Sequence, residues 1–198
     1  MKRVMIGTAV FMAVFLVTAV VGYQSKVEAQ AGREVVLFDG KSIDGWRKVG
    51  DANWHITNGY VEATMGAGHL VSMNPYTNFQ ITAEFWSDAD ANSGIFIRCP
   101  NPTDIGADKC YEVNIFDKRP DPKYRTGGIV DVAEPKARID AAGKWNTYEI
   151  TAQGTHLVIK LNGITTVDVM DSKFASGHFT LQYGAGTVRF RKVTIRQL

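Results

Sequence analysis

Apolar and polar residues alternate along most of the chain after residue 31, and no helical period persists there for more than two turns. Such alternation is typical of strands that bury one face. The clearest alternating segments are 79–86, 94–98, 112–116, 145–152, 155–161 and 188–196. Asn58-Gly59 and Asn162-Gly163 are two-residue hairpin signals, and a change of parity near Arg191-Lys192 indicates a β-bulge. We therefore expect residues 32–198 to form one all-β domain, a β-sandwich of about ten to twelve strands.

The first 31 residues form a separate segment. Lys2 and Arg3 precede an uncharged run of about 20 residues, and Ala29-Gln30-Ala31 fits the small-residue rule for signal peptidase. We expect cleavage after Ala31, with an uncleaved membrane anchor as the alternative. Cleavage would make the protein periplasmic or secreted and would leave no membrane segment. Since the remaining chain has nineteen basic and nineteen acidic residues, we expect no nucleic-acid partner.

The chain has two cysteines, Cys99 and Cys110, and the residues between them include two prolines and a glycine. This composition indicates a loop that joins two strands. In an oxidising compartment the two cysteines are expected to form a disulfide that closes this loop, with two free thiols as the alternative. A structural zinc site is not expected, because no further cysteine is available to complete it.

Polar and aromatic residues gather on one side of three predicted strands. If the apolar side faces the interior, the other side carries Glu84, Trp86, Phe96, Arg98, Glu112 and Asn114. A bulge at Asp117 would add its carboxylate. Aromatic rings stack on sugar rings, while carboxylates, amides and arginines bind hydroxyls. If the three strands are neighbours, the sequence predicts a sugar site on their shared face. The alternative is an ordinary solvated face, on which Glu84 and Arg98 form a cross-strand ion pair.

Other site classes lack their sequence signals. The chain has no glycine-rich phosphate loop after a strand and no Gly-x-Ser-x-Gly motif. The four histidines are scattered and suggest no metal triad, so each is interpreted as a surface or turn residue. No cofactor is required by the sequence and no metal ligand set is assigned, although a divalent cation remains possible.

Several motifs recur in a characteristic order. They are Leu37-Phe38-Asp39-Gly40-Lys41, Gly45-Trp46, Trp54-x-Ile56-x-Asn58-Gly59, Asn92-Ser93-Gly94-Ile95-Phe96-Ile97-Arg98, Tyr111-Glu112-x-Asn114-Ile115-x-Asp117, Thr126-Gly127, Trp145-Asn146, Asn162-Gly163, Leu181-Gln182 and Phe190-Arg191. On these motifs the chain resembles the 3-keto-disaccharide hydrolase family from about Val36 to Leu198, which is nearly all of the chain after residue 31. The resemblance implies an exported bacterial protein with a concanavalin-like jelly-roll β-sandwich of two antiparallel sheets. It also implies a saccharide substrate. We expect the protein to be a monomer.

The polar site positions of the family correspond in this chain to Glu84, Arg98, Glu112, Asn114 and Asp117. The chain departs from the family pattern at three places. The family often has Gln at the position of Asn114, Tyr at that of Val130 and His at that of Gly184, or of Tyr183 with a different gap. If the Tyr and His take part in the reaction of other family members, these departures imply that this chain has lost the activity or acts on a different substrate.

The resemblance further implies cleavage of glycosides that are oxidised to a ketone at C3. A carboxylate would remove the acidified C2 proton, and the C1 substituent would then leave. In this hypothesis Glu112 and Asp117 supply base and acid, and Arg98 stabilises the enolate oxygen. Asn114 and Glu84 orient hydroxyls, and Trp86 or Phe96 stacks on the sugar. A divalent cation could assist or replace Arg98.

Two other functions remain open at the level of sequence. The first is a non-catalytic, lectin-like module that binds glycans on the same face. The second is an ordinary glycoside hydrolase of the retaining type, which needs two carboxyl groups about 5–5.5 Å apart. The motif Glu112-x-Asn114-x-x-Asp117 lacks a middle acid and ends in the shorter Asp. These features argue against the second function.

Overall fold

A computed structural model describes residues 32–198, so the predicted signal segment lies outside the described residues. This part of the chain forms thirteen strands and one short 3-10 helix, Pro122–Tyr124. The strands are β1 Glu34–Phe38, β2 Trp46–Gly50, β3 His55–Thr57, β4 Tyr60–Ala63, β5 Gly68–Ser72, β6 Phe79–Ser87, β7 Asn92–Cys99, β8 Tyr111–Ile115, β9 Trp145–Gln153, β10 His156–Leu161, β11 Ile164–Met170, β12 His178–Ala185 and β13 Val188–Gln197. Within residues 32–198 there is no helix with the length and apolar character needed to cross a membrane.

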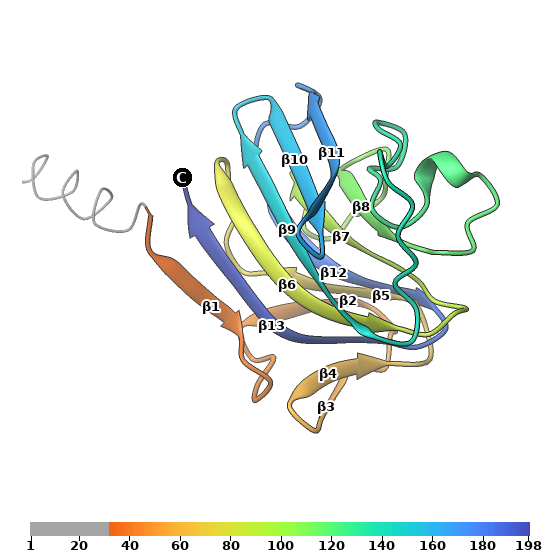
Figure 1. Cartoon of the computed structure of the whole chain (residues 1–198). Helices are drawn as coiled ribbons and strands as arrows, with labels where there is room; N and C mark the ends of the chain where they lie inside the picture. The colour runs from red at the N-terminus through yellow and green to blue at the C-terminus, as the bar shows by residue number, and fades with distance from the viewer. Residues whose placement is uncertain (1–31) are drawn as a thin grey trace, which may run out of the picture. The chain divides into compact units, whose positions relative to one another are not determined.

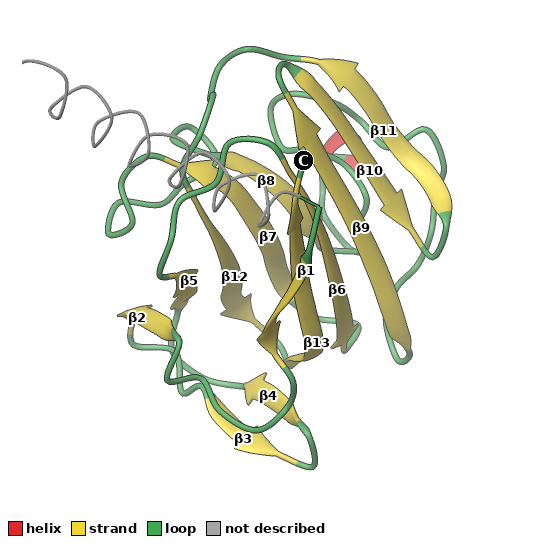
Figure 2. Cartoon of the chain, turned by 90° about the vertical axis from the view of Figure 1, so that its left-hand side faces the viewer, coloured by secondary structure: helices red, strands yellow, loops and turns green. Residues whose placement is uncertain are grey.

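The strands form two stacked antiparallel sheets (Figures 1 and 2). The eight-stranded sheet has the order β11-β10-β9-β6-β13-β4-β3, and β1 also pairs with β13. The five-stranded sheet has the order β2-β5-β12-β7-β8. The predicted all-β jelly-roll sandwich of two antiparallel sheets is thus confirmed.

The core lies between the sheets and takes alternate residues from each strand. Ile81 and Phe85 of β6 meet Ile95 of β7, Val113 of β8 and Leu181 of β12 in one buried cluster. Because successive side chains of a strand point to opposite faces, the residues between these apolar positions lie on the outer faces of the sandwich. The core thereby fixes which side chains are available on each outer face.

Both predicted hairpin turns are confirmed. Asn58 and Gly59, with φ of 47° and 78°, join β3 to β4, and Asn162 and Gly163, with φ of 53° and 79°, join β10 to β11. Two successive positive φ angles match the twist of antiparallel strands, and Asn-Gly tolerates them. The bulge predicted near Arg191-Lys192 is also present, as a register shift between Phe190 and Val193 against β6.

The assumption that the three predicted site strands are neighbours is wrong for one of them. β7 pairs with β8 in the five-stranded sheet, but β6 pairs with β9 and β13 in the eight-stranded sheet. Alternation shows that a strand buries one face, but it carries no information on which sheet receives the strand. Glu84 and Trp86 of β6 therefore lie on the opposite outer face of the sandwich from Glu112 and Asn114.

The disulfide predicted between Cys99 and Cys110 is present, with a Cα–Cα distance of 4.7 Å. It closes the loop between β7 and β8. The two cysteines pack with Phe96 and with Ile105 of the loop in a small apolar cluster, separate from the main core. The loop thereby covers part of the outer face of the five-stranded sheet beside Phe96.

Removal of the disulfide should destabilise the domain. Replacing both Cys99 and Cys110 by Ala frees a loop of about twelve residues, which by the chain-entropy model lowers the free energy of unfolding by about 3 kcal/mol. Urea denaturation of the variant and of the wild type, each with and without dithiothreitol, measures this loss. Dithiothreitol should shift the wild-type midpoint and leave the variant unchanged; an unchanged wild type would contradict the prediction.

Candidate functional site

The outer face of the five-stranded sheet carries a polar cluster on four neighbouring strands. Across one row, Thr180 of β12 pairs with Phe96 of β7, which pairs with Glu112 of β8. Across the next row stand His69, Gln182, Gly94 and Asn114. The flanking residues Leu70, Leu181, Ile95 and Val113 belong to the core, so the residues of these two rows point outward. We call these seven residues the outer cluster.

Gly94 lets two members of the outer cluster come together. A Cβ atom at this position would lie 3.3 Å from Cγ of Glu112 and 3.4 Å from Oε1 of Gln182. The side chains of β8 and β12 thus converge over the central strand in space that any other residue would fill. The glycine predicted as part of a family motif therefore has a steric reason.

Glu112 is the carboxylate of the outer cluster. Its residue is only 7% exposed, and no side-chain hydrogen bond to it occurs within residues 32–198. Burial raises the pKa of Glu112 to about 7; Arg119 lowers this pKa and Asp131 raises it, both to smaller extents. A carboxyl group with a pKa near neutrality is present in both protonation states, as a general acid or base requires.

Two side-chain oxygens next to Glu112 lack hydrogen-bond donors. Oδ1 of Asn114 and Oε1 of Gln182 are both buried, and neither has a hydrogen-bond partner among residues 32–198. The amide of Asn114 is oriented by its Nδ2, which donates to the backbone oxygen of Tyr124. Buried acceptors are normally satisfied, so these two oxygens lack the donors that such positions usually have.

His69 joins the cluster from β5 and was not predicted as a site residue. Its Nδ1 lies 2.9 Å from Oγ1 of Thr180, and its ring meets Phe96 edge to face at a centroid distance of 5.2 Å. Burial lowers the pKa of His69 to about 4, so its ring is neutral at neutral pH. The sequence held no motif around this histidine; only its place beside apolar Leu70 in a short strand hinted at an outward orientation.

Glu112 and His69 should affect stability oppositely over nearly the same pH range. Folded Glu112 keeps its proton up to pH 7, above its ordinary pKa of 4.5, so its contribution to stability falls as pH rises through this window. Folded His69 stays neutral down to pH 4, below its ordinary 6.5, so its contribution falls as pH drops. Each contribution amounts to at most about 3 kcal/mol.

Two single variants separate these contributions. Relative to the wild type, Glu112→Gln should gain stability from pH 4.5 to 7, whereas His69→Gln should gain stability from pH 6.5 down to 4. Urea denaturation at half-unit pH steps measures both differences. The prediction would be contradicted if the stability differences from the wild type changed with pH in the same direction for both variants.

Arg98 does not lie in the outer cluster, contrary to the sequence analysis. It has a φ of 56°, and the register between β7 and β12 shifts just beside it. This irregularity breaks the alternation after Phe96. Arg98 is 1% exposed, and its guanidinium donates to the backbone oxygens of Thr77, Gly154 and Phe174. Arg98 thereby ties three loops together.

Asp117 is also used structurally. Its Oδ2 accepts hydrogen bonds from the backbone N–H groups of Ala141 and Ala142 at 2.7 and 2.9 Å. Its Oδ1 also lies 3.9 Å from the guanidinium nitrogen Nη2 of Arg125. The structure therefore gives Asp117 a role as an anchor of the long loop before β9.

Two further departures from the family pattern fall next to the outer cluster. The backbone N–H of Val130 donates to the backbone oxygen of Glu112 at 3.0 Å, so position 130 neighbours Glu112. At Gly184 a Cβ atom would lie 3.0 Å from the backbone oxygen of Asn92. A larger residue at either position would alter the surroundings of the cluster.

Residues 33–196 match the family of 3-keto-alpha-glucoside-1,2-lyase-like domains. The chain belongs to this family. Because the family is described by a glucoside, membership in it relates the domain to carbohydrates. No protein of curated function matches the sequence. In residues 32–198 no group of three or more His, Cys, Asp and Glu side chains is arranged to hold a metal ion.

Several solved structures share the fold. A candidate glycosyl hydrolase from Parabacteroides distasonis ATCC 8503 is 22% identical, with a TM-score of 0.70 over 84% of this chain and 100% of that chain. A second one from the same organism is 18% identical, with a TM-score of 0.73 over 86% and 96%. The carbohydrate binding module CBM66 from Bacillus subtilis is 22% identical, with a TM-score of 0.62 over 77% and 96%. At these identities the likeness shows a common fold.

Proposed function

We propose that the domain cleaves glycosides that carry a ketone at C3, with Glu112 as the general base. The observation that carries this proposal is the carboxyl group of Glu112, buried on the outer face with a pKa of about 7. Membership in the lyase-like family supports the substrate class. A base of this pKa is matched to the removal of a carbon-bound proton at neutral pH.

The proposed reaction is a β-elimination. Glu112 takes the proton from C2, and the electrons of the C–H bond form an enolate with the C3 carbonyl. The enolate then re-forms the carbonyl and a C1–C2 double bond, the bond from C1 to the glycosidic oxygen breaks, and that oxygen takes up a proton as the alcohol leaves. Addition of water across the double bond would complete a net hydrolysis.

The neighbours of Glu112 have corresponding roles in this proposal. The side chains of Gln182 and Asn114, whose oxygens have no hydrogen-bond partner within the described residues, orient the sugar hydroxyls. Phe96 and the neutral ring of His69 provide an apolar wall that keeps the pKa of Glu112 high. Arg119, whose charge acts on Glu112, replaces Arg98 as the cation that stabilises the enolate oxygen.

We further propose that the protein acts outside the cytoplasm, after removal of the segment 1–31. The Cys99–Cys110 disulfide supports this location, because disulfides persist in oxidising compartments. The partner in this proposal is a small saccharide.

The decisive experiment compares a p-nitrophenyl 3-keto-α-glucoside with its unoxidised parent. We expect release of nitrophenol from the keto compound alone, because only the ketone acidifies the C2 proton. Equal release from both compounds would contradict the elimination mechanism.

Lectin-like binding without turnover is the second candidate. It is favoured by Val130 and Gly184, which stand next to the outer cluster where the family pattern has Tyr and His. Saturable binding of the keto compound without release of nitrophenol would support this candidate and would exclude catalysis.

A further inference from the structure

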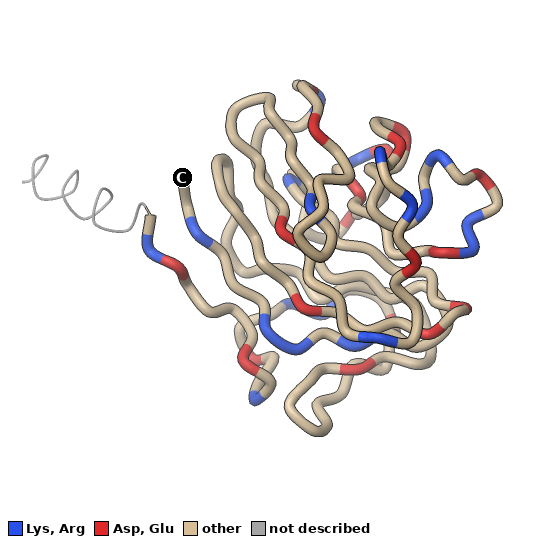
Figure 3. Tube along the Cα trace, viewed as in Figure 1, with Lys and Arg blue, Asp and Glu red and all other residues tan. Residues whose placement is uncertain are grey.

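Two consecutive cations point outward from the eight-stranded sheet. Phe190 of β13 pairs with Phe85 and Val193 pairs with Ala83, so Arg191 and Lys192 together lie opposite Glu84 of β6. In a regular strand one of the two would point into the core, but the bulge exposes both. Figure 3 shows the basic positions along β13.

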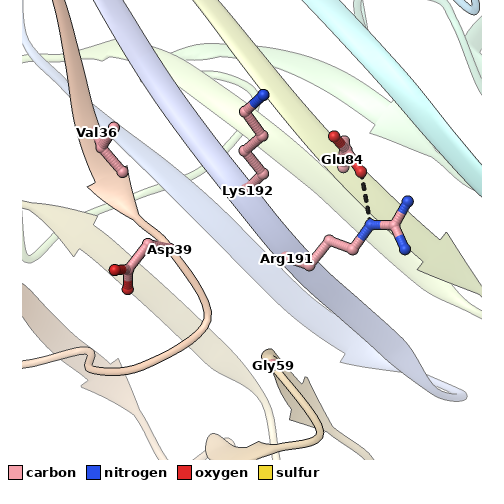
Figure 4. A pocket seen from close by; sticks show the side chains of 6 residues that line it. All are labelled: Val36, Asp39, Gly59, Glu84, Arg191 and Lys192. Carbon is pink, nitrogen blue, oxygen red and sulfur yellow. Dashed lines mark hydrogen bonds and ion pairs between the residues drawn. The ribbon is translucent and has the colours of Figure 1, made fainter.

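A cavity of about 410 Å³ lies beside these cations (Figure 4). It opens on the outer face of the eight-stranded sheet, whereas Glu112 lies on the outer face of the five-stranded sheet. Its lining combines three parts of the fold: β1 and the turn after it, the β3–β4 hairpin turn, and the paired strands β6 and β13. The lining residues are Val36, Asp39, Gly59, Glu84, Arg191 and Lys192. Its volume falls in the range of small-molecule sites. We call it the β13 cavity.

The cationic wall of the β13 cavity is held rigidly. Nε of Arg191 donates to Oε2 of Glu84 at 2.5 Å, and its guanidinium carbon lies 4.2 Å from the ring centroid of Trp145. The neighbouring Arg189 is fixed in the same way, by Glu62 and by the ring of Trp86. A wall fixed before binding lowers the entropy cost of holding a ligand.

Donors remain available on this wall. In the described part of the chain Lys192 has no ion pair, and the two terminal nitrogens of Arg191 have no hydrogen-bond partner. The lining holds two cations and two carboxylates, so its formal charge is balanced. Sugar hydroxyls both donate and accept, and each can bridge a cation and a carboxylate. Glu84 is paired with Arg191, and Asp39 is paired with Lys41 at 3.2 Å between Oδ2 and Nζ, so an anionic ligand would have to compete with both carboxylates for these cations.

We propose that the β13 cavity is a second saccharide-binding site, which takes a neutral sugar and has no part in turnover. It would let the domain hold a glycan on the face opposite Glu112. This site does not depend on the elimination reaction, so either proposal can fail without the other.

Titration of the ¹⁵N-labelled protein with maltose, followed by NMR, tests the site. We expect shifts of the Gly59 amide and the Trp145 indole, with a dissociation constant in the millimolar range. Lys192→Met should raise this constant at least fivefold and leave turnover of the keto compound unchanged. Arg196→Met is the matched control, since it removes one positive charge from the same strand outside the cavity.

Three results would overturn the proposal. The first is the absence of shifts at 50 mM maltose, and the second is a set of shifts confined to the outer cluster around Glu112. The third is an equal loss of affinity in Lys192→Met and Arg196→Met. A parallel titration with glucuronate tests whether the site prefers a neutral or an anionic sugar. Shifts of the Gly59 amide with glucuronate but not with maltose would show that the ligand is anionic.

Discussion

Glu112→Gln should lower the rate of cleavage of a 3-keto-glycoside by about 10²- to 10⁴-fold, the usual contribution of a general base. Gln has nearly the same shape but cannot take up a proton. The fold should be retained, because the carboxyl group is buried without a hydrogen-bonding partner in the described residues. Single-turnover assays of wild type and variant, with circular dichroism as the check on folding, measure the effect.

Glu149→Gln is the control for this prediction. It makes the same chemical change on β9, on the outer face of the eight-stranded sheet, and should leave the rate unchanged. The pH profile adds a second criterion. The wild-type rate should rise with an apparent pKa near 7, the value to which burial raises Glu112. Full activity of Glu112→Gln would remove Glu112 from the mechanism.

Arg98→Ala should lower the free energy of unfolding by about 3 kcal/mol or more. The buried guanidinium donates four hydrogen bonds to the backbone oxygens of Thr77, Gly154 and Phe174. Its removal leaves these oxygens without donors and leaves a cavity in place of a large side chain. Urea denaturation at neutral pH measures the loss.

The same variant separates a structural role of Arg98 from a catalytic one. The folded fraction of Arg98→Ala should keep the wild-type rate per molecule within a fewfold margin, because the guanidinium faces the loops and not the outer cluster. Arg98→Lys should recover part of the lost stability, since an ammonium group can donate to one or two of the same oxygens. If Arg98→Ala instead had wild-type stability and a rate lowered a hundredfold, Arg98 would have the catalytic role of stabilising the enolate oxygen.

The fold could be predicted from sequence because period-two alternation and Asn-Gly turns are local signals. The assignment of strands to sheets could not, because β6 and β7 have the same alternating pattern and enter different sheets. Glu84 and Trp86 were therefore expected on the wrong face. Arg98 was misplaced for a different reason. Its positive φ interrupts the alternation of side chains along β7, and the sequence has no glycine at this position to indicate such a φ.

The site was predicted only in part. Glu112, Asn114 and Phe96 do share one face, because β7 and β8 are adjacent in sequence and in space. His69 and Thr180 come from strands distant in the chain, and their contact depends on long-range pairing that sequence alone does not specify. Gln182 lay in a recognised motif, yet only Gly94 explains why its side chain reaches Glu112.

The loop closed by Cys99 and Cys110 bears on how the protein should be produced. Phe96 packs against this disulfide on one side and pairs with Glu112 across the strands. In the reducing cytoplasm of an expression host the loop would lose its covalent closure, and the apolar covering beside the carboxyl group would loosen with it. Material for assays should therefore come from periplasmic expression or oxidative refolding, with the thiol content checked before any inactive preparation is taken as evidence about the reaction.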